Sequence, residues 1–253
     1  MSHASAQPPP DLRLPADGTP HTDGADDSPW RRRFEAIYKS LRRRIILLEY
    51  PPGMRLDVAA LAEEFDVSRT PIRSVVQRLE GEGLAVTRHG VGTAVTEIDF
   101  DQVQDAMRFR MHLAELIGRL NPRPARVAVL DQLEKLREVC EALDGDLTPQ
   151  DFARIDMRLH DFKCNLIGNE HLRKTYDEMY YRAMRAWFYY LPRMDWPTEI
   201  RALGEDIRMT IAALRGDDVE AVGFLTRNAI SGGLYRLNAL KASGPQEDSD
   251  EVE

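Results

Sequence analysis

Cysteine is scarce in this chain, which has 253 residues but only Cys140 and Cys164. Two cysteines without CxxC spacing exclude a disulfide framework and a structural zinc ribbon. No apolar run approaches the roughly 20 residues that span a bilayer, so we expect no membrane partner. The beginning of the chain has neither the basic nor the apolar segment of a secretory signal, and we therefore expect a cytoplasmic protein.

Net positive charge is also missing, because the formal net charge of the chain is −8. The charge is unevenly distributed. Residues 1–29 carry five Asp and one Arg, and residues 241–253 carry five acidic residues and one Lys. Residues 30–98, in contrast, carry twelve Lys and Arg against nine Asp and Glu. A basic module among acidic neighbours favours a nucleic-acid partner in spite of the acidic total.

Large apolar residues are nearly absent from both ends of the chain. Residues 1–29 are rich in Pro, Asp, Gly and Ala, and residues 242–253 are acidic. Neither segment can bury enough apolar surface to offset the entropy lost on ordering. We therefore predict a disordered tail at each end, over 1–29 and 242–253.

Between the tails, apolar spacing predicts two domains in a mainly α-helical protein. The first, over 30–98, combines three short helices with a change to alternating strand-like spacing. Its expected elements are a helix over 34–48, a second over 58–65, a third from Ser68 at the N-cap to about Glu82, and a β-hairpin of 84–87 and 93–96.

The second domain, over 99–241, shows only helical apolar spacing. Helices of three to six turns with short connections imply a compact bundle of six or seven helices. The predicted segments are 100–120, 124–143, 149–167, 170–191, 197–215 and 217–241.

The third short helix begins like a helix that reads DNA. With Ser68 as its cap, Arg69, Thr70 and Arg73 project from one exposed side, and Arg78 follows further along. A helix N-terminus offers N–H groups to phosphate, and Arg reads guanine edges in the major groove. The alternative is that these arginines form only a solvated helix face.

Residues 32–97 resemble the winged helix-turn-helix of the GntR superfamily of bacterial transcription regulators. The segments that carry the resemblance are PGMRL at 52–56, LAEE at 61–64, VSRTPIR at 67–73, RLE at 78–80 and EGL at 82–84. Asp66 stands where that family usually has Gly, and Val58 where an acidic residue is common. The resemblance implies DNA contacts by Arg69, Thr70 and Arg73 and by the wing residues His89 and Gly90. We expect Arg55, Ser68 and Arg78 to contact DNA as well.

Residues 99–241 resemble the FCD ligand-sensing domain of the FadR-type branch of that superfamily. Asp156, His160 and Asn169 stand at positions similar to the D-x3-H…N signature of that domain. Arg110 matches an Arg that often faces the cavity, although a surface position is the alternative. The resemblance implies an effector-binding and dimerisation domain in which Arg110, Asp156, His160 and Asn169 face a small-molecule effector.

Family members that bind a metal ion add two histidines from the last two helices, where this chain has Asp206 and Asn228. The implied ligand set is therefore Asp156, His160, Asp206 and Asn228, which is rich in oxygen and suits Mn, Mg or Ca better than zinc or nickel. The alternative is a site without metal that takes a larger apolar or acyl ligand. A third arrangement would use Cys164, one turn beyond His160.

Aromatic residues are concentrated in one helix of the second domain. Eight of the 19 lie between Tyr176 and Trp196, where they either line a ligand cavity or form the bundle core. Together these features predict a transcription regulator, expected to be a repressor, that binds a pseudo-palindromic double-stranded operator as a homodimer. The competing class is a metal-dependent enzyme in the bundle. We do not expect an enzyme, because the sequence has no HExxH motif, nucleophile motif or phosphate-binding Gly loop.

Overall fold

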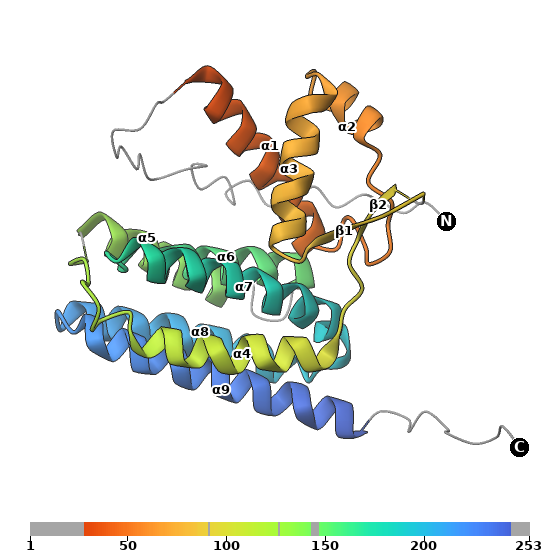
Figure 1. Ribbon diagram of the computed structural model, residues 1–253. Coiled ribbons are helices and arrows are strands. Elements are labelled where there is room, and N and C mark those ends of the chain that lie inside the picture. The colour runs from red at the N-terminus through yellow and green to blue at the C-terminus, as the bar shows by residue number, and fades with distance from the viewer. Residues whose placement is uncertain (1–27, 91, 126, 143–146, 244–253) are drawn as a thin grey trace, which may run out of the picture.

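The computed structural model describes residues 28–90, 92–125, 127–142 and 147–243, most of which are helical (Figure 1). Residues 1–27 and 244–253, which make up nearly all of the two predicted tails, lie outside the described residues. Helix α1 begins at Pro29 with Ser28 as its N-cap, and α9 ends at Ser243, so these two helices extend one or two residues into the predicted tails. None of the described helices is long and apolar enough to cross a bilayer.

Residues 28–98, called here the N-terminal module, form the predicted winged helix-turn-helix. Strands β1 and β2 pair antiparallel, with Ala85 opposite Val95 and Arg88 opposite Gly92. Arg55 forms an isolated bridge with Ala94 and extends this small sheet by one more segment. The elements of the module are α1 (Pro29–Ile46), α2 (Val58–Glu64), α3 (Arg69–Gly81), β1 (Ala85–Arg88) and β2 (Gly92–Val95).

The turn between α2 and α3 is held by local backbone chemistry. Asp66 has a φ of +50°, which confirms that Asp adopts the left-handed turn where the family usually has Gly. Arg33 of α1 donates hydrogen bonds to the carbonyl oxygens of Phe65 and Asp66. The buried side of α3, which includes Ile72 and Leu79, then packs into the core of the module.

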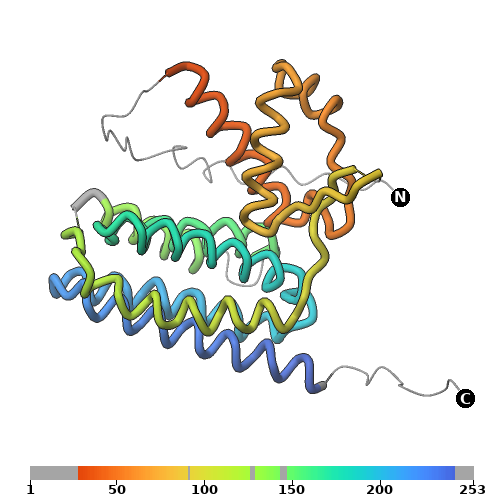
Figure 2. The backbone as a smooth tube through the Cα atoms, viewed as in Figure 1, coloured from red at the N-terminus to blue at the C-terminus, as the bar shows by residue number. Residues whose placement is uncertain are grey.

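Residues 99–243, called here the helical bundle, form two layers. In Figures 1 and 2, the helices α5, α6 and α7 lie next to the N-terminal module, and α4, α8 and α9 lie beyond them. Helix α7 packs on both α4 and α6, and α9 packs on α4 and α8. The helices are α4 (Phe100–Glu115), α5 (Val127–Ala142), α6 (Pro149–Asn165), α7 (Glu170–Tyr190), α8 (Trp196–Arg215) and α9 (Val219–Ser243), with a 3₁₀ turn at Leu191–Arg193.

Glycine allows a close backbone approach between the end of α4 and the start of α9. A Cβ atom at Gly118 would lie 2.2 Å from the Cα atom of Glu220. A Cβ atom at Gly223 would lie 2.7 Å from the carbonyl oxygen of Ala114. Any larger residue at either position would have to push the two backbones apart.

Helix α7 connects the bundle to the N-terminal module. Arg182 donates a hydrogen bond to the carbonyl oxygen of Gly81, at the end of α3, and Arg185 donates one to the carbonyl oxygen of Glu97. Burial lowers the pKa of Arg185 to about 10. One face of α7 therefore contacts the module, while other residues of the same helix face the interior of the bundle.

Candidate functional site

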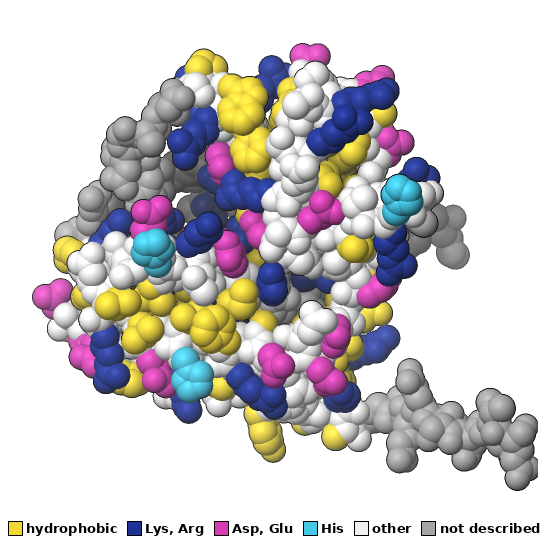
Figure 3. Space-filling view, viewed as in Figure 1, with side chains coloured by type: hydrophobic (Ala, Val, Ile, Leu, Met, Phe, Trp, Pro, Cys, Tyr) yellow, Lys and Arg dark blue, Asp and Glu magenta, His cyan; other side chains and the backbone are white. Residues whose placement is uncertain are grey.

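The N-terminal end of α3 points away from the bundle, and its C-terminal end contacts α7 (Figure 1). Ser68, Arg69, Thr70 and Arg73 are all exposed there. Figure 3 shows Lys and Arg side chains gathered over the α2–α3 end of the module and beside the wing. The structure therefore brings the predicted residues of the first turn together on one accessible surface, which agrees with a helix that enters a DNA groove.

Ser68 occupies the N-cap position of α3, as the sequence predicts, but its hydroxyl makes no capping hydrogen bond. The first N–H groups of a helix have no partner within the helix itself. Because the Ser68 side chain does not take them, they suit a bound phosphate group at the positive end of the helix dipole.

The wing carries the other predicted DNA contacts. His89 and Gly90 are exposed at the hairpin turn, and Gly90 has a φ of +76° with open space where a Cβ atom would lie. Arg55 lies against β2 beside the hairpin turn, with its guanidinium 3.4 Å from the position of a Cβ atom on Gly92. The wing therefore presents an imidazole and a guanidinium beside a backbone that can approach a phosphate closely.

Arg78 is in a different environment from the other predicted DNA contacts. Its Nη1 atom lies 2.6 Å from Oε1 of Glu35, and its guanidinium stacks 3.6 Å above the ring of Tyr38. Both partners belong to α1, so Arg78 ties α3 to α1. Its contact with DNA stays a prediction.

A cavity of about 440 Å³ lies inside the bundle. Arg110 lines it from α4, Asp206 from α8 and Asn228 from α9, so the structure brings distant predicted residues together. Asp156 and His160 line it from α6. Asn169 has another role, because its Oδ1 atom accepts a hydrogen bond from the Leu172 N–H and caps α7.

Three buried polar atoms on the cavity wall have no hydrogen-bond partner among the described residues. They are Arg110 Nε, His160 Nδ1 and Thr226 Oγ1. Arg110 is 4% exposed, and its guanidinium lies 5.0 Å from the ring centre of Tyr180. Since buried polar groups are nearly always hydrogen-bonded, these three atoms leave hydrogen-bonding capacity unused around one cavity.

The carboxylates of the predicted metal set are already engaged by other side chains. Lys163 Nζ lies 2.7 Å from each carboxylate oxygen of Asp206. The Tyr180 hydroxyl donates a 2.7 Å hydrogen bond to Asp156 Oδ2. Burial raises the pKa of Asp156, and this hydrogen bond and the charge of Arg110 oppose the rise. An ammonium on one ligand and a hydroxyl on another do not fit a divalent ion held by these residues.

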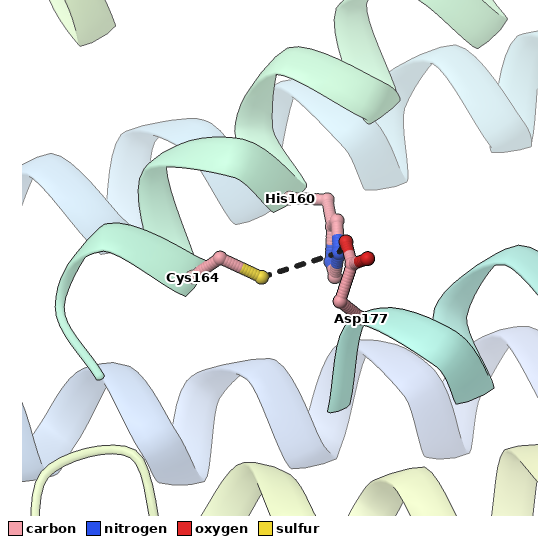
Figure 4. Close-up of side chains that lie close together, drawn as sticks. All are labelled: His160, Cys164 and Asp177. Atoms are coloured by element: carbon pink, nitrogen blue, oxygen red, sulfur yellow. Dashed lines mark hydrogen bonds and ion pairs between the residues drawn. The ribbon is translucent and has the colours of Figure 1, made fainter. Parts of the chain in front are cut away.

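A second cluster of possible metal ligands involves His160, Cys164 and Asp177 (Figure 4). His160 Nε2 lies 3.1 Å from Asp177 Oδ1 and 3.2 Å from Cys164 Sγ. A thiolate, an imidazole and a carboxylate are ligands that zinc accepts. However, burial raises the pKa of the Cys164 thiol and lowers that of His160 to about 4, which favours a protonated thiol beside a neutral imidazole.

Asp177 links this cavity histidine to the N-terminal module. Its second oxygen, Oδ2, lies 2.9 Å from Nη1 of Arg42 in α1. Arg42 Nε in turn lies 3.2 Å from Glu82, at the end of α3. Burial alone would raise the pKa of Asp177, but the His160 hydrogen bond and the Arg42 charge outweigh it and hold the pKa at about 2. One carboxylate therefore bridges the cavity wall and the module.

Four charged residues of the cavity wall were not predicted from the sequence: Lys163, Glu199, Glu205 and Arg236. Lys163 follows Asp156 by seven residues, so the helical repeat itself could have placed it on the same face of α6. Arg236 makes a bidentate contact with Glu199, at 2.6 and 3.1 Å, and nothing in the local sequence indicates that pairing.

Two family models match the chain. The model of bacterial regulatory proteins, gntR family, matches residues 33–95, which include α3 and the wing. The FCD domain model matches residues 105–232, half of the chain, which include most of the residues that line the cavity. The chain belongs to the gntR family and carries an FCD domain. Both resemblances noted in the sequence are thereby confirmed.

Curated relatives of this GntR protein are regulators by name. An uncharacterized HTH-type transcriptional regulator, YdhC of Bacillus subtilis (strain 168), is 27% identical over 144 residues, which are 56% of this chain and 64% of that protein. An uncharacterized HTH-type transcriptional regulator in an unstable DNA locus of Streptomyces ambofaciens is 32% identical over 141 residues, 55% of this chain and 58% of that protein. The chain thus spans less than two thirds of the length of these two relatives.

Solved structures of GntR proteins share the fold. E. coli McbR/YncC has a TM-score of 0.67 at 19% identity, over 83% of this chain and 97% of that one. A putative transcriptional regulator GntR from Rhodococcus sp. RHA1 has a TM-score of 0.60 at 17% identity, over 85% of this chain and 100% of that one. The two family models and the named relatives are those of a transcription regulator and not of an enzyme.

Proposed function

We propose that this GntR protein is a transcription repressor that binds a pseudo-palindromic operator as a homodimer and releases it when a small-molecule effector enters the bundle cavity. The proposal depends most on one observation, the exposed first turn of α3, where Arg69, Thr70 and Arg73 share an accessible surface. Two such surfaces related by a two-fold axis match two half-sites on DNA. Such a protein acts in the cytoplasm, where its operator lies.

The effector that the cavity favours is an organic carboxylate with an apolar body. Arg110 offers a buried guanidinium whose Nε atom lacks a partner, and Arg binds carboxylates in a bidentate manner. The walls supply apolar surface from Met107, Leu203 and Trp187, among others. A polar anchor inside an apolar cavity of this size is typical of small-molecule sites.

DNA binding is tested by fluorescence anisotropy with DNA from upstream of the gene encoding this chain, titrated at two salt concentrations. We expect Arg73→Ala to weaken specific binding by about 5- to 150-fold, since a bidentate base contact contributes about 1–3 kcal/mol. The matched control is Arg208→Ala, which removes the same charge from an exposed position on α8. Equal affinity of wild-type protein and the Arg73→Ala variant, with unchanged helix content, would remove Arg73 from the interface.

Release of the operator upon effector binding is tested in the same titration. Addition of short and medium-chain carboxylates, from acetate to decanoate, is expected to weaken DNA binding for at least one chain length. If none of these compounds changes the affinity for DNA and none raises the melting temperature of the protein, the carboxylate assignment is wrong, while DNA binding is judged by the Arg73 comparison alone.

A further inference from the structure

The helical repeat of α6 directs three ionisable residues at one region of the cavity. Asp156, His160 and Lys163 follow one another at intervals of four and three residues, and all three line the cavity. Asp206 faces the same cavity from α8. The set of residues that resembles a metal-binding site therefore already contains a cation, the ammonium of Lys163.

The contact between Lys163 and Asp206 is a buried ion pair. The ammonium lies 2.7 Å from both carboxylate oxygens, and the two side chains are 4% and 15% exposed. Thr210 donates a further, longer hydrogen bond of 3.4 Å to the same carboxylate. The charge of Asp206 is thus neutralised within the chain, and both of its oxygens are occupied.

A divalent ion on Asp206 would have to share this carboxylate with the ammonium. Two like charges in a low-dielectric interior repel each other strongly, because little water screens them. Lys163 would have to leave the cavity or lose its proton before an ion could bind. His160 offers only its Nδ1 atom, which has no hydrogen-bond partner among the described residues, because its Nε2 atom already faces Asp177 and Cys164 (Figure 4).

We infer that Lys163 is the resident cation of this cavity, that its ammonium replaces a metal ion at Asp206, and that the cavity takes its ligand without metal. This inference rests on the proposed effector cavity and concerns its chemistry. The anion-binding role then falls to the Arg110 guanidinium, which is buried and has an unpartnered Nε atom. Ligand binding is accordingly insensitive to chelators.

The test uses metal ions alone, on the full chain, so that neither the effector nor DNA is needed. Metal-free protein is titrated with Zn²⁺ and with Mn²⁺ by calorimetry, and bound metal is counted by elemental analysis after gel filtration. The variants are Lys163→Met, Lys163→Met with Asp206→Asn, Asp206→Asn alone, and Cys164→Ser, which removes a ligand of the second cluster. Lys135→Met is the matched control, because Lys135 is exposed on α5.

We expect no ion at position 206 in the wild-type chain, and none in the double variant Lys163→Met/Asp206→Asn. Lys163→Met is expected to gain about one ion per chain, with an affinity at least tenfold above wild type, since removal of the ammonium frees both oxygens. Lys163→Gln provides a second variant if Lys163→Met does not fold, as judged by circular dichroism.

Two results would overturn the inference. The first is a wild-type chain that holds about one ion, loses it in Asp206→Asn and keeps it in Cys164→Ser. The second is a folded Lys163→Met or Lys163→Gln variant that gains no ion. An ion that is lost in Cys164→Ser and kept in Asp206→Asn lies at the second cluster, and it supports the inference because Asp206 remains paired with Lys163. Failure of DNA binding would leave all these outcomes unchanged, so the two proposals fail separately.

Discussion

Acid is expected to destabilise this protein through one buried histidine, His160. The side chain is 3% exposed and lies between Tyr180, at a ring-centre distance of 3.6 Å, and Tyr176, at 5.2 Å. Burial lowers its pKa to about 4, and the Asp177 carboxylate opposes that effect without cancelling it. His160 is therefore neutral in the folded protein at neutral pH.

The sign of the effect follows from proton binding in the two states. The unfolded chain binds a proton at His160 as the pH falls through about 6.5, whereas the folded chain binds it only near pH 4. Stability from this residue is thus fully present above pH 6.5 and is lost as the pH falls toward 4. At about 1.4 kcal/mol per pH unit, the loss between pH 7.5 and 4.5 comes to about 2–3 kcal/mol.

The measurement is urea-induced unfolding at a fixed protein concentration from pH 7.5 to 4.5. His160→Gln keeps a hydrogen-bond donor for Asp177 but does not titrate, so its free energy of unfolding should vary less with pH than that of wild type, by about 2–3 kcal/mol over this range. His112→Gln is the control, because His112 is exposed on α4.

If the free energy of unfolding depends on pH equally in wild type and in His160→Gln, then His160 is not the source of the loss of stability in acid. A variant that is simply less stable at every pH, with an unchanged slope, would mean that His160 packs in the core but is not protonated on unfolding in this range. A slope change of similar size in His112→Gln would show that the effect is not specific to burial.

Two further predictions concern stability. Gly118→Ala should lower the free energy of unfolding by at least about 2 kcal/mol, because its Cβ would lie 2.2 Å from a Cα atom of α9. Gly81→Ala, with no atom within 4 Å of its Cβ, serves as the control in thermal denaturation and should not destabilise. Asp177→Asn should cost about 1–2 kcal/mol at neutral pH, allowing for a side chain that is 32% exposed. Because the folded pKa of Asp177 is about 2, below its unfolded value, this cost should shrink as the pH falls from 4 to 2, and urea titrations that show a constant difference would contradict it.

The positions of the helices were readable from the sequence because their signals are local. Apolar spacing predicted all six long helices of the bundle, with ends that differ from the structure by a few residues. The N-cap at Ser68 and the left-handed turn at Asp66 depend on neighbouring residues only. The predicted break at 144–145 lies outside the described residues.

The candidate site was only partly readable. The resemblance to FCD domains indicated Arg110, Asp156, His160, Asp206 and Asn228, and the structure places all five around one cavity. It also indicated an effector contact at Asn169, whose side chain caps α7 in the structure; its contact with an effector stays a prediction. The fold was thus easier to predict from the sequence than the chemistry of the cavity.

The sequence by itself determined the helical segments and the N-cap of α3, since these depend on interactions within a few turns of one helix, and its family motifs identified the winged helix-turn-helix. Only the tertiary structure decided which charges meet. Lys163 pairs with Asp206, 43 residues away, and Arg42 pairs with Asp177, 135 residues away. Those pairings depend on how the helices pack against one another, and the burial that results also sets the pKa values of His160 and Asp177.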